Sequence, residues 1–310
     1  MRQFTIIVAL AALSSLTSAH WVHSNGSHFH DPHSGKTIRH FNCGAKASHA
    51  TKHFLDAVKK LHHNAPKSGG SRAPNLTKKQ VPSPITIPTY FHIISSAANE
   101  GTITQDMADA QIATLNTAYN PYGISFTLEQ TTFTTNDAWA VAAGTDMDAA
   151  KAALRQGTYG NLNLYFHTDL AGGNLGTCTL PSQVPAGSDA SVYVSDGCNV
   201  NAATMPGGQM QGYNMGLTAV HETGHWLGLL HTFEGYACDG DGDFIDDTSF
   251  ESQSTNGCPV KPAKDSCPST TGVDPVHNFM DYSTDACYEQ FTPGQVARMG
   301  AMWSQFRAGM

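Results

Sequence analysis

Three histidines occupy the spacing that a catalytic zinc site requires. The string HETGHWLGLLH places His221 and His225 four residues apart, so a helix would present both imidazoles on one face. Gly228 can end that helix, because glycine accepts a positive φ angle, and the chain can then return to bring in His231 as a third ligand. Three protein ligands leave a fourth tetrahedral position open, which is typical of a catalytic rather than a structural zinc ion.

Glu222 supplies the carboxylate that hydrolysis needs as a general base. It follows the first histidine directly and is placed to take a proton from a zinc-bound water, whose pKa falls from about 15.7 towards 7. The resulting hydroxide would attack a peptide carbonyl, and Glu222 would pass the proton to the leaving amine. The alternative is a plain core helix with hydrogen-bonded histidines, since Leu217, Val220 and Leu227 make this segment apolar. We expect a zinc endopeptidase with one zinc ion per chain.

Three segments of different composition follow one another along the 310 residues. Residues 1–19 combine Arg2, an apolar run and a small-residue Thr-Ser-Ala cleavage sequence, which predicts a signal peptide and secretion. Residues 20–80 are expected to be a basic, histidine-rich prosegment, and residues 81–310 a catalytic domain. The apolar run is too short to cross a bilayer and no later segment approaches that length, so no membrane partner is expected.

The formal charge of −8 is divided unevenly between these segments. Residues 1–80 carry 11 lysines and arginines against two acidic residues, whereas residues 81–310 carry six against 23. A basic segment can be a nucleic-acid arm, but this one lacks interleaved aromatic residues, and the acidic remainder disfavours nucleic acid as a partner. Charge complementarity instead favours a detachable prosegment that inhibits its own enzyme in a latent zymogen.

Candidate processing and modification sites lie within the prosegment. The dibasic pairs Lys59-Lys60 and Lys78-Lys79 could be cut, and the sequons that begin at Asn25 and Asn75 predict glycosylation of a secreted chain. Ten of the 16 histidines lie between residues 20 and 63. They could make the binding of the prosegment depend on pH, although such a run is more often solvated and inert.

Hydrophobic periodicity predicts alternating strands and helices, then an irregular region and a last helix, which is an α+β (mixed α/β) fold class. The expected strands are residues 85–94, 124–128, 162–166 and 192–194. The expected helices are residues 53–62, 106–119, 147–154, 216–229 and 293–306.

The zinc motif resembles that of the metzincins, in which a methionine turn lies beneath the metal. Asn-Phe-Met-Asp-Tyr at residues 278–282 supplies such a turn, and the two motifs together resemble the pappalysin family, especially its secreted fungal and bacterial metalloproteases. The strands at residues 87–92 and 162–166 and the CDGDGDFIDDT loop at 238–248 also match, so the resemblance covers roughly residues 80–310. Ser249 departs from the proline expected after that loop, which concerns loop rigidity rather than chemistry.

The resemblance implies a metzincin zincin fold, with a twisted, mostly parallel sheet and the active-site helix in an N-terminal subdomain and an irregular, disulfide-bonded C-terminal subdomain. It also implies residue roles. The three histidines would bind zinc, with Glu222 as general base and acid. Met280 would be a hydrophobic floor below the metal without bonding to it, and the Tyr282 hydroxyl would steady the tetrahedral intermediate.

Seven cysteines in a secreted chain leave one unpaired. Cys43 is the only cysteine of the prosegment, and its setting, RHFNCG, resembles the cysteine switch of latent metzincins. We expect its thiolate to occupy the fourth zinc position until the prosegment is removed; a spare thiol or an intermolecular disulfide is the alternative. The other six cysteines allow fifteen pairings, of which a local Cys178–Cys198 bridge is reasonable. The resemblance favours Cys238–Cys267 and Cys258–Cys287.

Five aspartates crowd one short loop: Asp239, Asp241, Asp243, Asp246 and Asp247. Clustered carboxylates repel one another unless a cation or solvent separates them, and Ca²⁺ takes six to eight oxygen ligands. The spacing begins like an EF-hand loop but lacks its glycine and closing glutamate. The resemblance implies calcium near this loop, so a structural calcium site is expected, with a solvated acidic turn as the alternative.

Protein or peptide substrates are expected to lie extended along an edge strand near residues 174–180. Asp285, close to the methionine turn, could favour a basic residue just after the cleaved bond. Two other classes stay open. One is a catalytically silent secreted zinc-binding or adhesion module, which would have no use for Glu222; the other is an effector protease with a single protein target.

Overall fold

The computed structural model describes residues 29–30, 37–38, 41, 43–45, 47–64 and 83–310. The expected signal peptide at residues 1–19, both sequons and the Lys78-Lys79 pair lie outside these residues. Across the described part of the chain, none of the helices has the length and apolar character needed to span a membrane.

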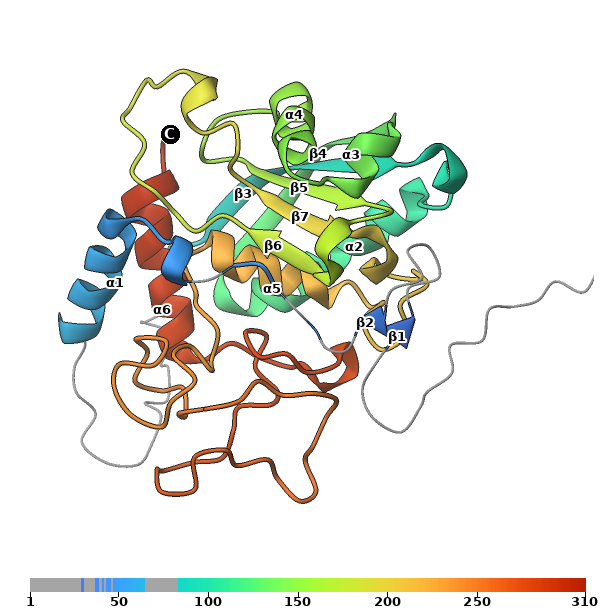
Figure 1. The fold of residues 1–310 in the computed structure, drawn as a ribbon. Coiled ribbons are helices and arrows are strands. Elements are labelled where there is room, and N and C mark those ends of the chain that lie inside the picture. Colours follow the sequence, from blue (N-terminus) through green and yellow to red (C-terminus); the bar gives the residue numbers. More distant parts are fainter. Residues whose placement is uncertain (1–28, 31–36, 39–40, 42, 46, 65–82) are drawn as a thin grey trace, which may run out of the picture.

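A five-stranded sheet forms the centre of the fold (Figure 1). Its strands are β3 (Ile85–Ser95), β4 (Ile124–Thr135), β5 (Leu162–His167), β6 (Gly176–Cys178) and β7 (Cys198–Asn201), in the spatial order β4-β3-β5-β7-β6. Parallel pairing joins β4 to β3, β3 to β5 and β5 to β7. Strand β6 is the antiparallel edge. The mostly parallel sheet predicted from the sequence is therefore confirmed.

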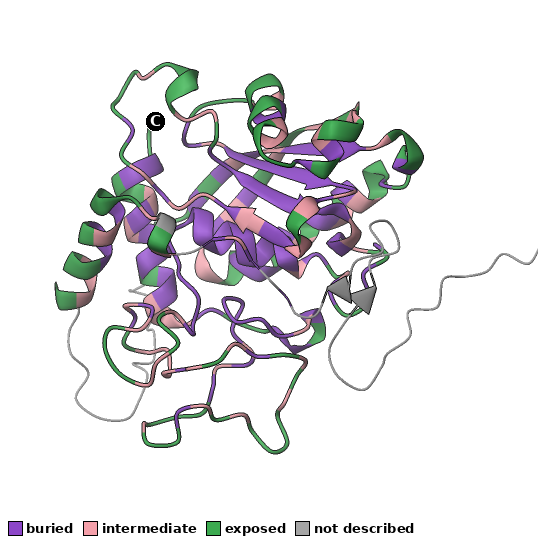
Figure 2. Cartoon of the chain, viewed as in Figure 1, coloured by how far each residue is buried: buried purple, intermediate pink, exposed green. Residues whose placement is uncertain are grey.

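Helices cover both faces of this sheet. Helices α2 (Gln105–Tyr119) and α5 (Leu217–Trp226) pack on one face, and α3 (Asp137–Val141) and α4 (Thr145–Leu154) pack on the other (Figure 1). All six residues of β5 are buried, as expected for a parallel strand enclosed by two helical layers (Figure 2). The core thus supports α5 from the sheet side, and α5 carries the zinc motif.

The chain after α5 is irregular until α6 (Pro293–Met302) and a π-helical turn, Trp303–Arg307. The Arg307 guanidinium bonds both carboxylate oxygens of Asp196 at 3.0 and 3.1 Å, and its Nε donates to the carbonyl of Trp226 at 3.1 Å. Because all three residues are buried, this network ties the C-terminus to the end of α5. Three disulfides are present, with the pairing expected from the sequence: Cys178–Cys198, Cys238–Cys267 and Cys258–Cys287.

The structure corrects several predicted elements. The strand predicted at residues 192–194 is wrong: Ala190–Val192 is a 3₁₀ turn with Val192 59% exposed, and the strand of this region is β7 instead. The Asp189 side chain accepts a hydrogen bond from Ser191 N, and this local turn overrides the β propensity of the Val-Tyr-Val run. Helix α5 is shorter than predicted, and β4 is longer.

Some elements were not predicted at all. These are α3, β7 and the two-residue strands β1 (Phe29–His30) and β2 (Thr37–Ile38); β1 and β2 pair antiparallel. Helix α1 (Lys52–Asn64) matches the helix expected at residues 53–62 and lies beside α6 (Figure 1). The dibasic pair Lys59-Lys60 lies inside α1, and since proteases bind extended backbone, cleavage there requires α1 to unfold locally.

Candidate active site

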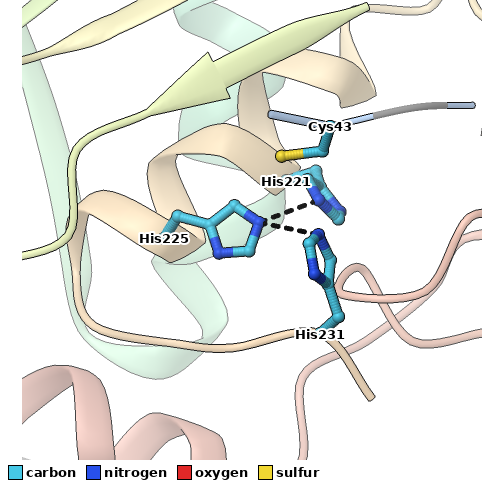
Figure 3. Close-up of side chains that lie close together, drawn as sticks. All are labelled: Cys43, His221, His225 and His231. Carbon is cyan, nitrogen blue, oxygen red and sulfur yellow. Dashed lines mark hydrogen bonds between the residues drawn. The ribbon is translucent and has the colours of Figure 1, made fainter. Parts of the chain in front are cut away.

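Helix α5 and the turn that follows it bring the three histidines together. His221 and His225 lie one turn apart on α5. Gly228 has a φ of +93°, and a Cβ there would lie 2.5 Å from Met302 Cγ, so only glycine suits this reversal. The chain then returns His231, and the Nε2 atom of His225 lies 3.1 Å from the Nε2 atoms of both His221 and His231 (Figure 3).

The hydrogen bonds made by the Nδ1 atoms of His221 and His225 determine the tautomer of each ring. The Nδ1 atom of His221 donates to the carbonyl of Phe279 at 2.7 Å, and that of His225 donates to Leu229 O at 2.9 Å. Since each Nδ1 carries the proton, each Nε2 presents a lone pair. Burial, with the neighbouring histidines, lowers the pKa of His225 to about 3 and that of His221 well below its usual value, so both rings are neutral. Lone pairs converging at this distance repel unless a cation lies between them, and three imidazoles suit zinc.

Glu222 lies beside this cluster and is fully buried. Its Oε2 accepts a hydrogen bond from the Cys43 thiol at 3.4 Å, while Oε1 has no hydrogen-bond partner within the described residues. Burial raises the pKa of Glu222 to about 8. A carboxylate with a pKa near neutrality is suited to accept a proton and then release it.

The methionine turn lies against α5. Met280 is fully buried, and a Cβ on Gly224 would come within 2.5 Å of its Sδ atom, which places the thioether directly against the zinc-motif helix. The Tyr282 ring lies 5.0 Å from that of His231, and its hydroxyl accepts a hydrogen bond from the backbone N–H of Cys43 at 3.0 Å. Burial raises the pKa of Tyr282, so the hydroxyl keeps its proton and can donate a hydrogen bond.

Cys43 is buried, is not disulfide-bonded and points at the histidines (Figure 3). Its sulfur and one nitrogen from each of the three histidines all lie within 4.8 Å of one another. Burial and the charge of Glu222 raise the pKa of the Cys43 thiol, so a thiolate at this position requires a nearby cation. Cys43 also pairs in parallel with Gly176 of β6, and Gly44 N donates to Gly176 O at 3.0 Å.

Phe41 is a cleft residue that the sequence did not reveal. It is 1% exposed, and its ring centroid lies 4.8 Å from those of His221 and Tyr282 and 5.8 Å from that of Tyr213. Phe41 and Cys43 therefore fill adjacent parts of the same cleft. The only sequence signal was the proximity of Phe41 to Cys43.

A second missed group lies behind the methionine turn. Glu251 Oε2 accepts a hydrogen bond from the hydroxyl of Thr232, the residue after the third histidine, at 2.7 Å. Its Oε1 lies 2.6 Å from Lys264 Nζ, which also contacts Asp274. Thr255 Oγ1 donates to Glu251, and Thr255 N donates to Asp281 of the methionine turn. This network joins the segment of His231 and Thr232 to the methionine turn, and its members are too far apart in sequence to form a motif.

The five aspartates of the 239–247 loop have different surroundings. Asp239, Asp241 and Asp246 are exposed, and Asp246 also lies 3.4 Å from a histidine of α1. Asp247 accepts hydrogen bonds from the hydroxyl of Thr292, the N-cap residue of α6, and from Gly294 N in the first turn of that helix. Asp243 is buried, with its pKa raised to about 7 by burial; one of its oxygens accepts two hydrogen bonds from the loop, and Oδ2 has no partner within the described residues.

Asp285 is also buried, with 1% of its surface exposed. One oxygen accepts a hydrogen bond from Met215 N at 2.7 Å, just before α5, and the other has no partner among the residues that the structure describes. Burial raises the pKa of Asp285 to about 7. The backbone N–H of Asp285 donates to the carbonyl of Gly212, the neighbour of Tyr213, whose ring contacts Phe41. Burial, followed by the charge of Asp285, raises the pKa of Tyr213.

A zinc-motif helix beside a mostly parallel sheet, with a methionine turn beneath three converging histidines, defines a metzincin-type zinc metallopeptidase. Residues 145–304 match the peptidase M43 family, described as pregnancy-associated plasma protein-A. An extracellular metalloprotease of Neurospora crassa is 44% identical over 274 residues, which cover 88% of this chain and 91% of that protein. One of Colletotrichum graminicola is 42% identical over 312 residues, covering 98% and 99%. The chain belongs to the pappalysin family of metzincins.

Solved structures agree with this assignment. A mature mirolysin of Tannerella forsythia in complex with a cleaved peptide superposes with a TM-score of 0.61 at 26% identity, covering 73% of this chain and 94% of that one. A promirolysin mutant of the same organism gives a TM-score of 0.65 at 24% identity, covering 86% and 95%, which supports the fold. The chain is a zinc metalloendopeptidase, and the extracellular relatives support its secretion.

Proposed function

We propose that this metalloendopeptidase is made as a latent zymogen, in which residues 20–80 inhibit the catalytic domain of residues 81–310. The observation that carries the proposal is the position of the Cys43 sulfur within 4.8 Å of the three converging histidine nitrogens. One zinc ion per chain, held by the three histidines, would have Cys43 as its fourth ligand in the zymogen and water in the mature enzyme.

In the mature enzyme, the chain's own residues would bind the substrate and move the proton. Zinc supplies Lewis acidity and a water of lowered pKa when bound. Glu222 would take a proton from that water and hand it to the leaving amine. The Tyr282 hydroxyl donates a hydrogen bond to the developing oxyanion. The edge strand β6 pairs its backbone with an extended substrate.

The prosegment engages each of these groups in the zymogen. The Cys43 sulfur lies 3.4 Å from Glu222 Oε2, Cys43 N donates to the Tyr282 hydroxyl, and Gly44 N donates to the carbonyl of Gly176 on β6. One short segment therefore blocks the base, the oxyanion donor and the substrate-binding edge. An adhesion module would have no need for such a blockade, and this favours the protease over a silent binding protein.

The test compares the secreted full chain with its Cys43→Ala variant, before any processing, on casein-derived peptides. We expect the intact parent to be inactive and intact Cys43→Ala to cleave at least tenfold faster, because the fourth position opens to water. The double variant Cys43→Ala/Glu222→Ala controls for contaminating proteases. Full latency in intact Cys43→Ala would overturn the role of the cysteine. A processed parent that binds zinc without cleaving mixed peptides would favour a silent module or a single-target effector.

We also propose that Asp285 favours a basic residue just after the cleaved bond. Its support is a buried carboxylate oxygen without a partner among the described residues, near the Tyr213 ring that contacts Phe41. A peptide library cleaved by the processed enzyme tests this: Asp285→Asn should abolish a preference for Arg or Lys at that position. An unchanged preference would contradict it.

A structural calcium ion in the 239–247 loop is a further part of the proposal. The buried Asp243 oxygen without a partner within the described residues supports it, whereas Asp247 is already hydrogen-bonded to the N-terminal end of α6. Isothermal titration calorimetry of the chain with calcium should show one binding site, and the Asp243→Asn substitution should remove it. Absence of binding heat in the parent would leave the loop a solvated acidic turn.

A further inference from the structure

Helix α1 of the prosegment is held on the enzyme at a place separate from the cleft. Phe54, Ala57 and Val58 follow the i, i+3, i+4 spacing of one helix face and are 0%, 6% and 0% exposed. They form a hydrophobic cluster distinct from the one that contains Phe41 and Cys43. The prosegment therefore has two anchors, joined by the short stretch between them.

The enzyme supplies a preformed apolar surface for this helix face. We call it the α1 surface, and it consists of Leu180, Leu230, Phe244, Met302 and Phe306. Its residues come from the loop after β6, the zinc-motif turn, the acidic loop and the C-terminal helix, which lies beside α1 in Figure 1. Because the disulfides and the Arg307 network fix these elements without α1, this surface should persist in the mature enzyme.

Charge complements the apolar contact. Helix α1 carries three lysines and three histidines against one aspartate, and its C-terminal end lies beside the acidic loop at Asp246. His62 Nδ1 lies 3.4 Å from Asp246, and the His62 ring contacts Phe244 edge-on at 6.0 Å. An amphipathic helix with a small aromatic-aliphatic face and a basic flank is thus the ligand that the α1 surface fits.

We propose that the α1 surface is an exosite that retains the excised prosegment through α1, which rests on the zymogen role proposed above for residues 20–80. Cleavage between residues 65 and 82 then leaves the fragment bound by two anchors and the enzyme still latent. Activation requires a second event that separates the anchors, such as a cut between Gly44 and Lys52. Free fragment also inhibits mature enzyme in trans more strongly than its cleft-binding part alone.

The experiment uses the full chain with a recognition sequence for a site-specific viral protease placed between residues 65 and 82. Fragment retention after cutting is measured by size-exclusion chromatography of the Glu222→Ala chain, which cannot digest itself. Latency is measured as peptide cleavage by the cut chain that keeps Glu222. The cut parent should keep its fragment and stay latent. Phe54→Ala/Val58→Ala should release the fragment with at least tenfold weaker retention and gain activity. Asp56→Ala/Lys59→Ala, on the exposed face of α1 and neutral in net charge, should behave as the parent.

Cys43→Ala separates the exosite from the cysteine. It should become active and yet keep its fragment, because α1 remains docked. If the Cys43→Ala chain stays latent while retention of the fragment still depends on Phe54 and Val58, the proposed role of Cys43 is contradicted and the proposed exosite is supported. A fragment that leaves the cut parent at once, or that Phe54→Ala/Val58→Ala holds as tightly as the parent, overturns the exosite.

A synthetic peptide of residues 51–64 gives a measurement that does not depend on how the prosegment variants fold. It should displace labelled fragment from the cut Glu222→Ala chain, and the same peptide with Phe54→Ala/Val58→Ala should require at least tenfold higher concentration. Equal potency of the two peptides would show that this face of α1 does not recognise the enzyme.

Discussion

Replacing Lys264 with methionine tests whether a buried charge network holds the segment of His231 and Thr232 against the methionine turn. Lys264 Nζ lies 2.6 Å from Glu251 Oε1 and 2.7 Å from Asp274 Oδ2, and the lysine side chain is 19% exposed. Methionine keeps the length and apolar contacts of the chain but leaves both carboxylates without this cation. Breaking a buried pair by removing one partner destabilises a protein by about 3–5 kcal/mol.

Proton uptake makes this loss depend on pH. Burial and the charge of Asp281 already raise the pKa of Glu251 from 4.5 to about 8. A carboxyl with a raised folded-state pKa binds more protons in the folded than in the unfolded state between those values, so stability falls as pH rises through that window. Removing Lys264 raises this pKa further, so stability keeps falling to higher pH than in the parent. We expect a loss of roughly 3 kcal/mol at pH 8.5 and a smaller loss at pH 6.

Urea denaturation of the secreted chain at both pH values, followed by tryptophan fluorescence, measures the loss. Zinc affinity should also fall about tenfold, because Glu251 no longer steadies Thr232 beside the third ligand. Lys261→Met, at an exposed lysine of the same loop, is the matched control and should change neither quantity. A loss below about 1 kcal/mol at pH 8.5, or an equal loss for Lys261→Met, refutes the reasoning.

Three further changes test the site. Gly176→Ala should lower kcat at least tenfold with zinc content unchanged, since its Cβ would overlap the Glu222 carboxylate; normal turnover would contradict that contact. Tyr282→Phe should lower kcat by about 10²–10³ with little change in KM, as expected for a lost oxyanion donor, and a pure KM effect would assign it to binding instead. Gly228→Ala should destabilise the fold by about 1–3 kcal/mol in urea denaturation, because its φ is +93°, and an unchanged midpoint would argue against strain there.

The convergence of the three histidines could be predicted because its geometry is local. His221 and His225 are related by one helical turn and His231 by one glycine reversal, so the spacing alone specifies the convergence. Strands such as β3 and β5 were predicted for a similar reason, because long apolar runs between turn residues report burial on both faces. Glu222 is adjacent to the first ligand and needed no further information.

What the sequence did not predict depends on contacts between distant segments. Lys264 is 13 residues from Glu251 and unites carboxylates that no periodicity relates. Phe41 lies in the cleft beside Cys43, which pairs with β6. The apolar run at residues 192–194 is strand-like in composition, yet it forms no strand and Val192 is exposed. The aspartates of the 239–247 loop look equivalent in sequence, yet Asp247 is hydrogen-bonded to the N-terminal end of α6 and Asp243 is buried. Tertiary packing decides such cases, and local propensity does not.

The most direct test measures zinc content and casein-peptide cleavage of the secreted, processed protein beside its Glu222→Ala variant. The account predicts one zinc per chain in both proteins, cleavage by the parent that a chelator abolishes and zinc restores, and no cleavage by Glu222→Ala. Cleavage by Glu222→Ala, or zinc bound without cleavage in a parent whose prosegment removal is confirmed by mass, would contradict it.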